Sequence, residues 1–226
     1  MRVVMTILLA VFLPLAALMV VLAPPVCQAL AQRAIAQNVA DPLEQEHLVA
    51  VAMAVRDFSV GNDDAAMPAG VDYRYAITAD AIEHLLDVRV VFVGAEIACL
   101  LLLVILLVLV GLTWRRSKSA ALKRPLTIGG LIPLLAALGL GIAVFVDFDA
   151  FFTWLHSLFF ADGSWTFPAD SLLIRALPYN FWLSCAVVWA LCMAVFCCIC
   201  IAVGLVLPKR RGVAAAHSGA AAAATK

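Results

Sequence analysis

The stretch VVFVGAEIACLLLLVILLVLVGL, residues 90–112, decides what class of protein this is. Glu96 is its only charged residue. A helix rises about 1.5 Å per residue, so a run of this length spans the roughly 30 Å hydrocarbon core of a bilayer. The sequence therefore predicts that this segment crosses a membrane as a helix.

Three further apolar blocks are also long enough to cross a bilayer. They cover residues 1–23, 127–146 and 181–207. The chain is 65% hydrophobic and 13% charged, against about 25% charged residues in average proteins, which excludes a soluble fold. We therefore predict an all-α integral membrane protein with four transmembrane helices and a small outward-facing helical cap.

The first block has two readings. Arg2 precedes it and small residues near Ala29 and Ala31 follow it, as in a cleaved signal peptide. Its apolar run is longer than the usual run of about 7–15 residues, however, and this favours an uncleaved helix.

The charged residues indicate the orientation. All acidic residues except Glu96 fall within 41–87 or 147–170, whereas residues 114–124 hold five basic residues and no acid. Another basic cluster, KRR at 209–211, follows the last block. Lys and Arg are enriched in cytoplasmic loops, so we expect both termini in the cytoplasm. The predicted order is transmembrane helix 1 (1–23), an outward-facing domain (24–89), helix 2 (90–112), a cytoplasmic loop (113–126), helix 3 (127–146), an outward-facing aromatic segment (147–180), helix 4 (181–207) and a disordered cytoplasmic tail (208–226).

Two helices are expected in the first outward-facing domain. The sequence DPLEQEHLVAVAMAVRDF (41–58) has apolar residues at helical spacing, with Asp41 as its N-cap and Pro42 at the first helical position. Thr78 is expected to cap a second helix, which carries His84 and continues into the membrane. This continuity would hold His84 on a rigid element just above the hydrocarbon boundary.

The second outward-facing segment is unusually aromatic. FDAFFTWLHSLFFADGSWTFPADSLLIRALPYNFW (148–182) holds eleven of the chain's twenty aromatic residues, and Trp and Tyr collect at membrane interfaces. Apolar residues from Phe151 to Phe159 recur at helical spacing, which predicts an amphipathic interfacial helix that carries His156. A second short helix is expected at about 169–176.

The cysteines do not indicate a metal site or a disulfide. Cys27 is the only one of seven on an outward-facing segment. CCIC at 197–200 resembles a metal motif only by its letters, because a thiolate site inside lipid lacks room and outer hydrogen-bond partners. Packing is the favoured role, with palmitoylation near the cytoplasmic side as the alternative.

Two histidines, His84 and His156, are both predicted at the outer interface although they are far apart in sequence. Neutral imidazole can accept one proton and give another near pH 7, so a pair at one depth suggests acid–base chemistry. The alternative is that His84 only reaches toward water and His156 only caps an aromatic cluster. Asp87, one turn after His84, could orient its ring or could simply lie on the helix surface. Arg89 suits a lipid phosphate or a carbonyl, or it only keeps the helix from sinking into the membrane.

No nucleophile accompanies these histidines. Ser157 adjoins His156 but points about 100° away around the helix, and there is no G-x-S-x-G turn. The role of Glu96 stays open, because an acid within a membrane helix is often functional, but one near the interface can also reach up to water.

EHLLDVR (83–89) and the aromatic sequence at 148–182 together resemble the lipoprotein intramolecular transacylase family. The family motifs are H-[ML]-x-D-V-[RK] before the second helix and FH-x-x-FF…W…D-x-LI…LP-x-x-FW before the fourth. The resemblance covers about residues 1–207 and departs at Leu155, where Phe is usual, and at Tyr179, where an acid is common. It implies that His84 and His156 are catalytic and that five further residues support or position the substrate: Asp87, Arg89, Trp165, Asp170 and Arg175.

The resemblance also implies a reaction. The family moves the sn-2 acyl chain of a diacylglyceryl-cysteine to the α-amine of the same cysteine, which yields a lyso-form lipoprotein. Attack through a ring of roughly eight atoms can replace an acyl-enzyme, because holding both reactants in one molecule supplies much of the acceleration. One histidine would take the amine proton and the other would bind the carbonyl oxygen or protonate the leaving alkoxide. We favour His156 as the base and His84 as the acid, with the aromatic residues excluding water.

The implied setting is the bacterial cytoplasmic membrane, with the active site at the outer leaflet. We expect a monomer that acts on diacylated lipoproteins among membrane lipids, without a cofactor, a metal or nucleic acid. The rival functions are an interfacial lipid hydrolase or intermolecular acyltransferase, and a non-enzymatic four-helix structural protein. We further expect the two imidazoles within about 10 Å of each other across one outward-opening cleft, close enough to act on one substrate.

Overall fold

The computed structural model describes residues 1–37, 41, 43–117 and 119–208. Apart from an isolated bridge between Ala69 and Ile77, regular structure in these residues is helical. The elements are α1 (Arg2–Leu22), α2 (Pro24–Ala36), α3 (Gln45–Ser59), α4 (Ala79–Ser117), η1 (Ser119–Ala121), α5 (Lys123–Val146), α6 (Phe148–Ser157), α7 (Leu172–Ala176) and α8 (Tyr179–Val206).

Four segments are long and apolar enough to cross a membrane. They are Arg2–Leu22, Ala79–Arg115, Ser119–Val146 and Tyr179–Val206. The predicted class, an all-α integral membrane protein with four transmembrane helices, is therefore confirmed.

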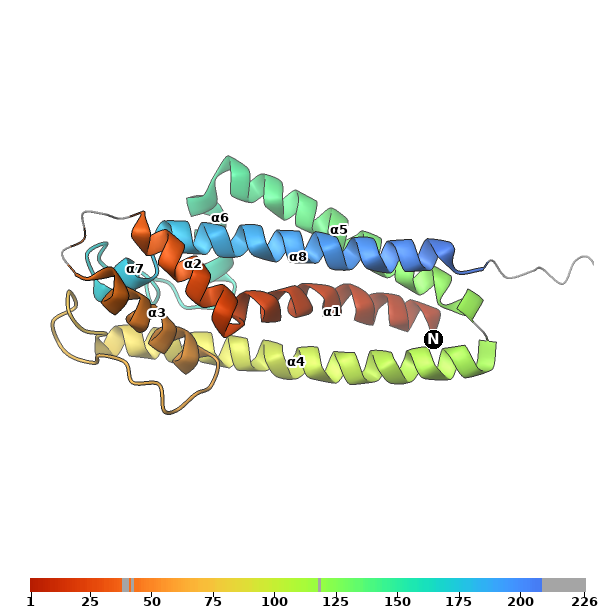
Figure 1. Ribbon diagram of the computed structural model, residues 1–226, viewed down its shortest axis with the longest axis horizontal. Coiled ribbons are helices and arrows are strands. Elements are labelled where there is room, and N and C mark those ends of the chain that lie inside the picture. The colour runs from red at the N-terminus through yellow and green to blue at the C-terminus, as the bar shows by residue number, and fades with distance from the viewer. Residues whose placement is uncertain (38–40, 42, 118, 209–226) are drawn as a thin grey trace, which may run out of the picture.

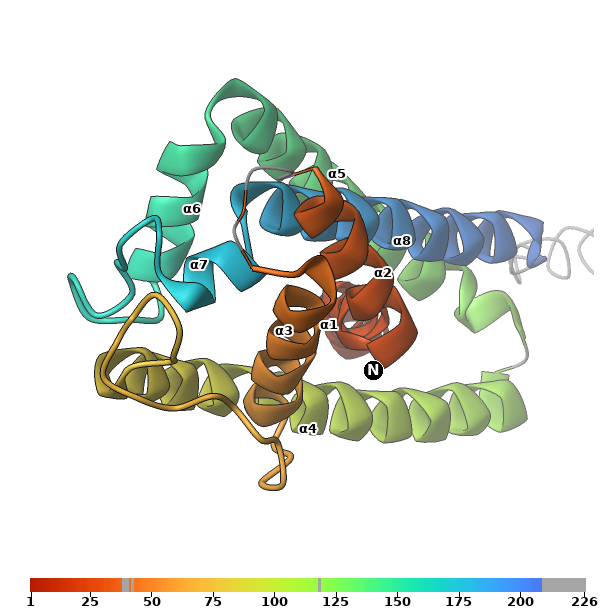
Figure 2. The same cartoon turned by 60° about the vertical axis from the view of Figure 1, so that its left-hand side comes forward.

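The helix α1 lies at the centre of the bundle. It packs against α4, α5 and α8, and α5 also packs along α8, so that α1 separates α4 from the other two long helices (Figure 2). Across this core the indole N–H of Trp189 on α8 donates to the carbonyl of Pro14 on α1, 3.1 Å away. The buried apolar side chains of the bundle are Leu9, Leu13, Ala17, Leu106, Ala137, Met193 and Cys197.

Small residues allow α5 and α8 to approach closely. A Cβ on Gly204 would lie 2.5 Å from Thr127 Oγ1 and 2.9 Å from the Thr127 amide nitrogen. A Cβ on Gly130 would lie 3.0 Å from the carbonyl oxygen of Cys197. Van der Waals packing between small residues is a main source of helix association in membranes, so these two glycines set the α5–α8 contact.

The four shorter helices α2, α3, α6 and α7 gather at one end of the bundle (Figure 1). The N-terminus and the connection from α4 to α5 lie at the opposite end (Figure 1). Residues from α2, α3, α4, α7 and α8 share one apolar core at the capped end. Arg56 on α3 donates from Nε to the carbonyl of Leu22, 2.8 Å away, and this bond joins the cap to the last turn of α1.

The predicted helix over 41–58 begins later than expected. Glu44, not Asp41, occupies the N-cap position of α3. Asp41 instead forms a bidentate ion pair with Arg175 on α7, with 2.7 Å between one carboxylate oxygen and Nε. The pair is buried, and it satisfies the carboxylate better than exposed helix N–H groups would. Pro42 lies outside the described residues.

Other local expectations have mixed outcomes. The helix after Thr78 runs without a break through His84 into the second apolar block, as predicted, and α6 confirms a helix that carries His156; its place at the membrane interface stays a prediction. The second short helix spans only Leu172–Ala176, because the Ser171 hydroxyl accepts from the amide of Ile174 and so caps it later than expected. Helix α2 was not predicted. Of the predicted tail (208–226), residues 209–226 lie outside the described residues.

Candidate active site

His84 occupies the second turn of α4, where the helix rises into the cap, and its side chain is turned inward. Only 8% of its surface is exposed. Phe160 meets the imidazole edge-on with 4.9 Å between ring centroids, and Phe167 lies 5.7 Å away. Both phenylalanines come from the aromatic segment after α6, so the segment covers the histidine.

His156 lies in the last turn of α6, and its tautomer follows from its hydrogen bond. Its Nδ1 lies 2.8 Å from the carbonyl oxygen of Phe152, one turn earlier. A carbonyl oxygen only accepts, so Nδ1 must carry the proton. In the neutral ring the lone pair is then on Nε2, which is the nitrogen that can take a proton from a substrate. The Phe152 ring holds the imidazole in place with 3.9 Å between centroids.

The two imidazoles come together as expected. Their centroids are 6.3 Å apart and their planes differ by 28°. Phe160 contacts both rings, at 4.9 Å from His84 and 5.4 Å from His156. The prediction that the imidazoles lie near one another is confirmed, and a single phenylalanine spans the pair.

Two buried polar atoms at this site have no hydrogen-bond partner. Across the described ranges, His84 Nδ1 and Trp165 Nε1 are the only buried side-chain nitrogen or oxygen atoms in this condition. The Trp165 ring lies tilted against His156 with 4.8 Å between centroids, and Phe160 contacts both imidazoles, so both atoms belong to one cluster. An unsatisfied buried polar group costs about 1–3 kcal/mol, and such groups in native structures call for an explanation.

The surroundings of His156 favour its uncharged form. Burial away from water lowers the pKa of His156, and the hydrogen bond to Phe152 opposes this shift more weakly. A positive charge on one imidazole would also repel a charge on the other at this separation. The site is therefore suited to hold at least one neutral imidazole near pH 7.

Asp87 and Arg89 lie near the histidines in sequence but face other groups. Asp87 is exposed, and no hydrogen bond joins it to His84 among the described residues. Arg89 pairs with Asp63 at 2.7 Å and donates to the carbonyl of Gly61 at 3.2 Å. Arg89 was expected to suit a lipid phosphate or a carbonyl. The structure shows it bound to the Gly61 carbonyl, and this contact holds the loop after α3 against α4.

Asp170 and Arg175 connect the aromatic segment to the rest of the cap. Asp170 accepts from Arg74 at 3.1 Å in an exposed pair. Arg175 holds the buried Asp41 and also donates to the carbonyl of Arg74 at 3.0 Å. Of the three supporting residues expected in this segment, Trp165 is the one that contacts a histidine.

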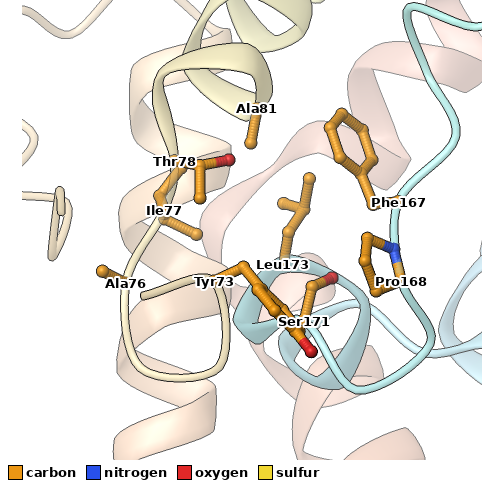
Figure 3. A pocket seen from close by; sticks show the side chains of 9 residues that line it. All are labelled: Tyr73, Ala76, Ile77, Thr78, Ala81, Phe167, Pro168, Ser171 and Leu173. Atoms are coloured by element: carbon orange, nitrogen blue, oxygen red, sulfur yellow. The ribbon is translucent and has the colours of Figure 1, made fainter. Parts of the chain in front are cut away.

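A small cavity of about 20 Å³ adjoins the site on the side of α7. Figure 3 shows Phe167 and Pro168 facing Thr78 and Ala81 across it. Phe167 is shared, because its ring also contacts His84. This space holds about one water molecule, so it borders the imidazoles without being large enough for an acyl chain.

Sequence reasoning missed the individual roles of three phenylalanines. Phe152, Phe160 and Phe167 surround the imidazoles, whereas the aromatic residues were expected only to exclude water and hold acyl chains. The spacing of Phe152 and His156 was a usable signal, because residues four apart lie on one helix face. No comparable signal marked Phe160 or Phe167, which lie outside the helices.

Comparisons with known proteins identify the family of this chain. The family model described as "Lipoprotein intramolecular transacylase Lit" matches residues 2–182. No curated protein matches the chain. A solved structure of the membrane integral lipoprotein intramolecular transacylase from Bacillus cereus is similar, with a TM-score of 0.73, 17% identity and coverage of 89% of this chain and 91% of that one.

Two more structures of the Bacillus cereus protein carry substitutions of one histidine. The histidine-to-arginine form has a TM-score of 0.66 at 15% identity, and the histidine-to-alanine form 0.69 at 14%. Both comparisons cover 91% of each chain. At these identities the structures show a shared fold, while the family model covers most of the sequence. This chain belongs to the lipoprotein intramolecular transacylase family.

Proposed function

We propose that His84 and His156 carry the proton transfers of the family's reaction, in which the sn-2 acyl chain of a diacylglyceryl-cysteine moves to the α-amine of the same cysteine. The observation that carries the proposal is the pair of imidazoles 6.3 Å apart inside one aromatic cluster. Each ring can then contact a different atom of one reacting ester.

His156 acts as the general base. The neutral α-amine attacks the ester carbonyl carbon, and its proton passes to Nε2, the nitrogen left free by the bond from Nδ1 to Phe152. A free α-amine has a pKa of about 7.7–8.0, so an appreciable fraction of the substrate arrives with a neutral amine at pH 7. The resulting tetrahedral intermediate carries the charge on the former carbonyl oxygen.

His84 acts as the general acid. When the intermediate collapses, the bond from carbon to the sn-2 oxygen breaks, and the leaving alkoxide takes a proton from the protonated His84 imidazole to become a hydroxyl. The amide nitrogen keeps the acyl chain, so the atoms balance without water. His156 is then protonated and His84 neutral, and return of one proton from His156 to His84 after product release restores both rings for the next turnover. No acyl-enzyme forms, because nucleophile and ester are held in the same molecule.

The aromatic rings around the pair keep competing water away. Phe152, Phe160 and Trp165 each contact His156 by ring centroids within 5.4 Å. Water would hydrolyse the ester that the amine must attack, so its exclusion favours transfer over hydrolysis.

The setting of the reaction is the outer face of the bacterial cytoplasmic membrane. The connection from α4 to α5, which follows and precedes basic residues in the sequence, and the N-terminus are at the end of the bundle away from the cap (Figure 1), and this supports cytoplasmic termini. The site would then face the outer leaflet, where a monomer meets diacylated lipoproteins. Arg89, Asp170 and Arg175 serve it by holding the cap and the aromatic segment in place. The negative charge of Asp87 favours the protonated form of His84.

Mass spectrometry of a diacylated lipoprotein tests this function. Intramolecular transfer leaves the total mass unchanged while fragmentation shows an N-acyl cysteine. Hydrolysis would remove one acyl mass, and intermolecular transfer would require an added phospholipid donor. Either of those products from the wild-type protein would replace the proposal with the corresponding rival.

Variants of the histidines test their roles. His156→Ala and His84→Ala should each lower the rate of N-acyl product formation by about 10²–10⁴. His47→Ala is the matched control, because His47 is exposed on α3 and contacts neither imidazole. Unchanged rates in both site variants would contradict the assignment. They are the result expected if the protein has a structural role and no catalytic one.

A further inference from the structure

The aromatic segment contains a buried hydrogen-bond donor that the protein itself leaves unused. Trp165 Nε1 is shielded from solvent and has no acceptor within the described part of the chain. Its ring lies tilted against His156 with 4.8 Å between centroids and meets Phe152 edge-on at 6.2 Å. The donor therefore belongs to the ring cluster that holds the proposed base.

Two other indoles in this protein, both half-buried, are satisfied by backbone carbonyls. Trp182, which contacts the same Phe152 ring, donates to Leu177 at 3.1 Å. Trp189 donates to Pro14 at 3.1 Å. The fold supplies an acceptor to each of these two indoles. The N–H of Trp165, beside His156, differs from them because it is buried and has no acceptor among the described residues.

We infer that the indole N–H of Trp165 donates a hydrogen bond to the carbonyl oxygen of the ester on which the two histidines act. The inference rests on the proposed function and adds a residue to it. Indole is a donor only and stays uncharged over the working pH range, so it needs an acceptor such as an ester carbonyl. It makes and breaks no covalent bond.

The chemistry of acyl transfer gives this donor a function. As the amine attacks, the carbonyl oxygen gains negative charge, and a fixed donor binds that oxygen more strongly in the transition state than in the ground state. His156 is occupied with the amine proton and His84 with the leaving oxygen. A third group is therefore needed at the carbonyl oxygen, and Trp165 is the neighbour of His156 with a free donor.

The position of Trp165 allows the ester to reach it. The residue lies between α6 and α7, after the turn at Gly163, and not within a helix. Its ring can therefore shift to admit the carbonyl without breaking helical hydrogen bonds. Binding of the acceptor would satisfy an N–H that is otherwise buried and unpaired.

Trp165→Phe tests the inference, because it removes the N–H and keeps an aromatic ring against His156. We expect kcat to fall about 10²–10³-fold, with a much smaller change in KM, because the bond strengthens in the transition state. The melting temperature in detergent should stay the same or rise, because the substitution removes an unsatisfied buried donor. Replacement of Trp165 by benzothienylalanine, which keeps the bicyclic shape without the N–H, should lower kcat similarly.

Trp189→Phe is the matched control. It makes the same chemical change in the core of the helix bundle, outside the ring cluster, where it leaves the Pro14 carbonyl without its donor. This variant should lower the melting temperature while kcat stays close to that of the wild type. Loss of kcat without loss of melting temperature in Trp165→Phe, and the reverse in the control, would distinguish a donor to the substrate from a packing residue.

Two results would overturn the inference. The first is a wild-type kcat in Trp165→Phe; the second is wild-type activity in the benzothienylalanine protein, which would assign any loss in Trp165→Phe to ring shape. The proposed function fails differently, through absence of N-acyl product in the wild type or full activity of the histidine variants. The two failures are therefore distinguishable in one set of assays.

Discussion

At the scale of single residues, the site depends on which nitrogen of His156 is protonated. The bond from Nδ1 to the Phe152 carbonyl assigns the proton to Nδ1 and the lone pair to Nε2. Burial then keeps the ring neutral by lowering its pKa. A residue four positions earlier on the same helix thus orients the proposed base and sets its tautomer, while burial keeps it neutral.

This arrangement predicts a specific pH profile. The substrate amine must be neutral and His84 must be protonated to act as the acid, so log(kcat/KM) should be level just below the amine pKa of about 7.7–8.0 and should fall above it. His156 must be neutral, and because its pKa, like that of His84, is lowered from 6.5, a second break should appear below pH 6.5. Below that break the slope should approach two.

The profile is measured as the initial rate of N-acyl product formation between pH 5 and pH 9, about the range in which both groups titrate. A second break above pH 6.5 would show that the His156 pKa is not lowered. A substrate whose amine is replaced by a less basic nucleophile should lose the upper break and keep the lower one.

At the scale of elements, the pairing of α5 with α8 depends on small residues. Gly204 lies so close to Thr127 that an added methyl group would meet backbone atoms of α5. Interiors at this density do not absorb an extra methyl group without shifting a helix. Because α6 and α7 lie on the chain between α5 and α8, such a shift would also disturb the segment that carries His156.

Gly204→Ala should therefore destabilise the protein by about 1–3 kcal/mol through overpacking. Gly139→Ala, on α5, is the matched control, because a Cβ added at Gly139 would meet no neighbouring side chain or helix within 4 Å. That change should be neutral or slightly stabilising, since alanine is the better helix former. Thermal unfolding in detergent measures both, and equal melting temperatures for the two variants would contradict the close α5–α8 contact.

At the scale of the whole molecule, the two ends of the bundle differ in charge and in structure. One end carries the cap and the imidazole pair, and the other carries the N-terminus and the basic connection between α4 and α5 (Figure 1). On the positive-inside rule we expect the basic end in the cytoplasm. The site and the cap would then share the outer face with the lipoprotein substrate.

Cysteine labelling tests this orientation. In a variant whose seven native cysteines are replaced, Val71→Cys in the cap should react with a membrane-impermeant maleimide on intact cells, since Val71 is 99% exposed. Ser119→Cys, in the connection before α5, should react only after the cells are permeabilised. Reversed labelling would place the site on the cytoplasmic side.

Several features of the site were within reach of the sequence. His84 and His156 stood out because each lies just outside an apolar block, and depth in a membrane follows from local hydropathy. The N-cap role predicted for Asp41 is wrong because its partner, Arg175, lies more than one hundred residues away. Helix α2 escapes prediction because paired prolines usually interrupt a helix, although proline is favourable in a first helical turn.

By itself the sequence determined the class, the four membrane-crossing segments and the family motif. These depend on the length and composition of continuous stretches, and the bilayer imposes a fixed thickness that such stretches must match. Only the tertiary structure decided that the imidazoles lie 6.3 Å apart, that Phe160 spans them and that the Trp165 N–H has no acceptor among the described residues. Such contacts join elements distant in the chain, and their distances depend on how the helices pack rather than on any local pattern.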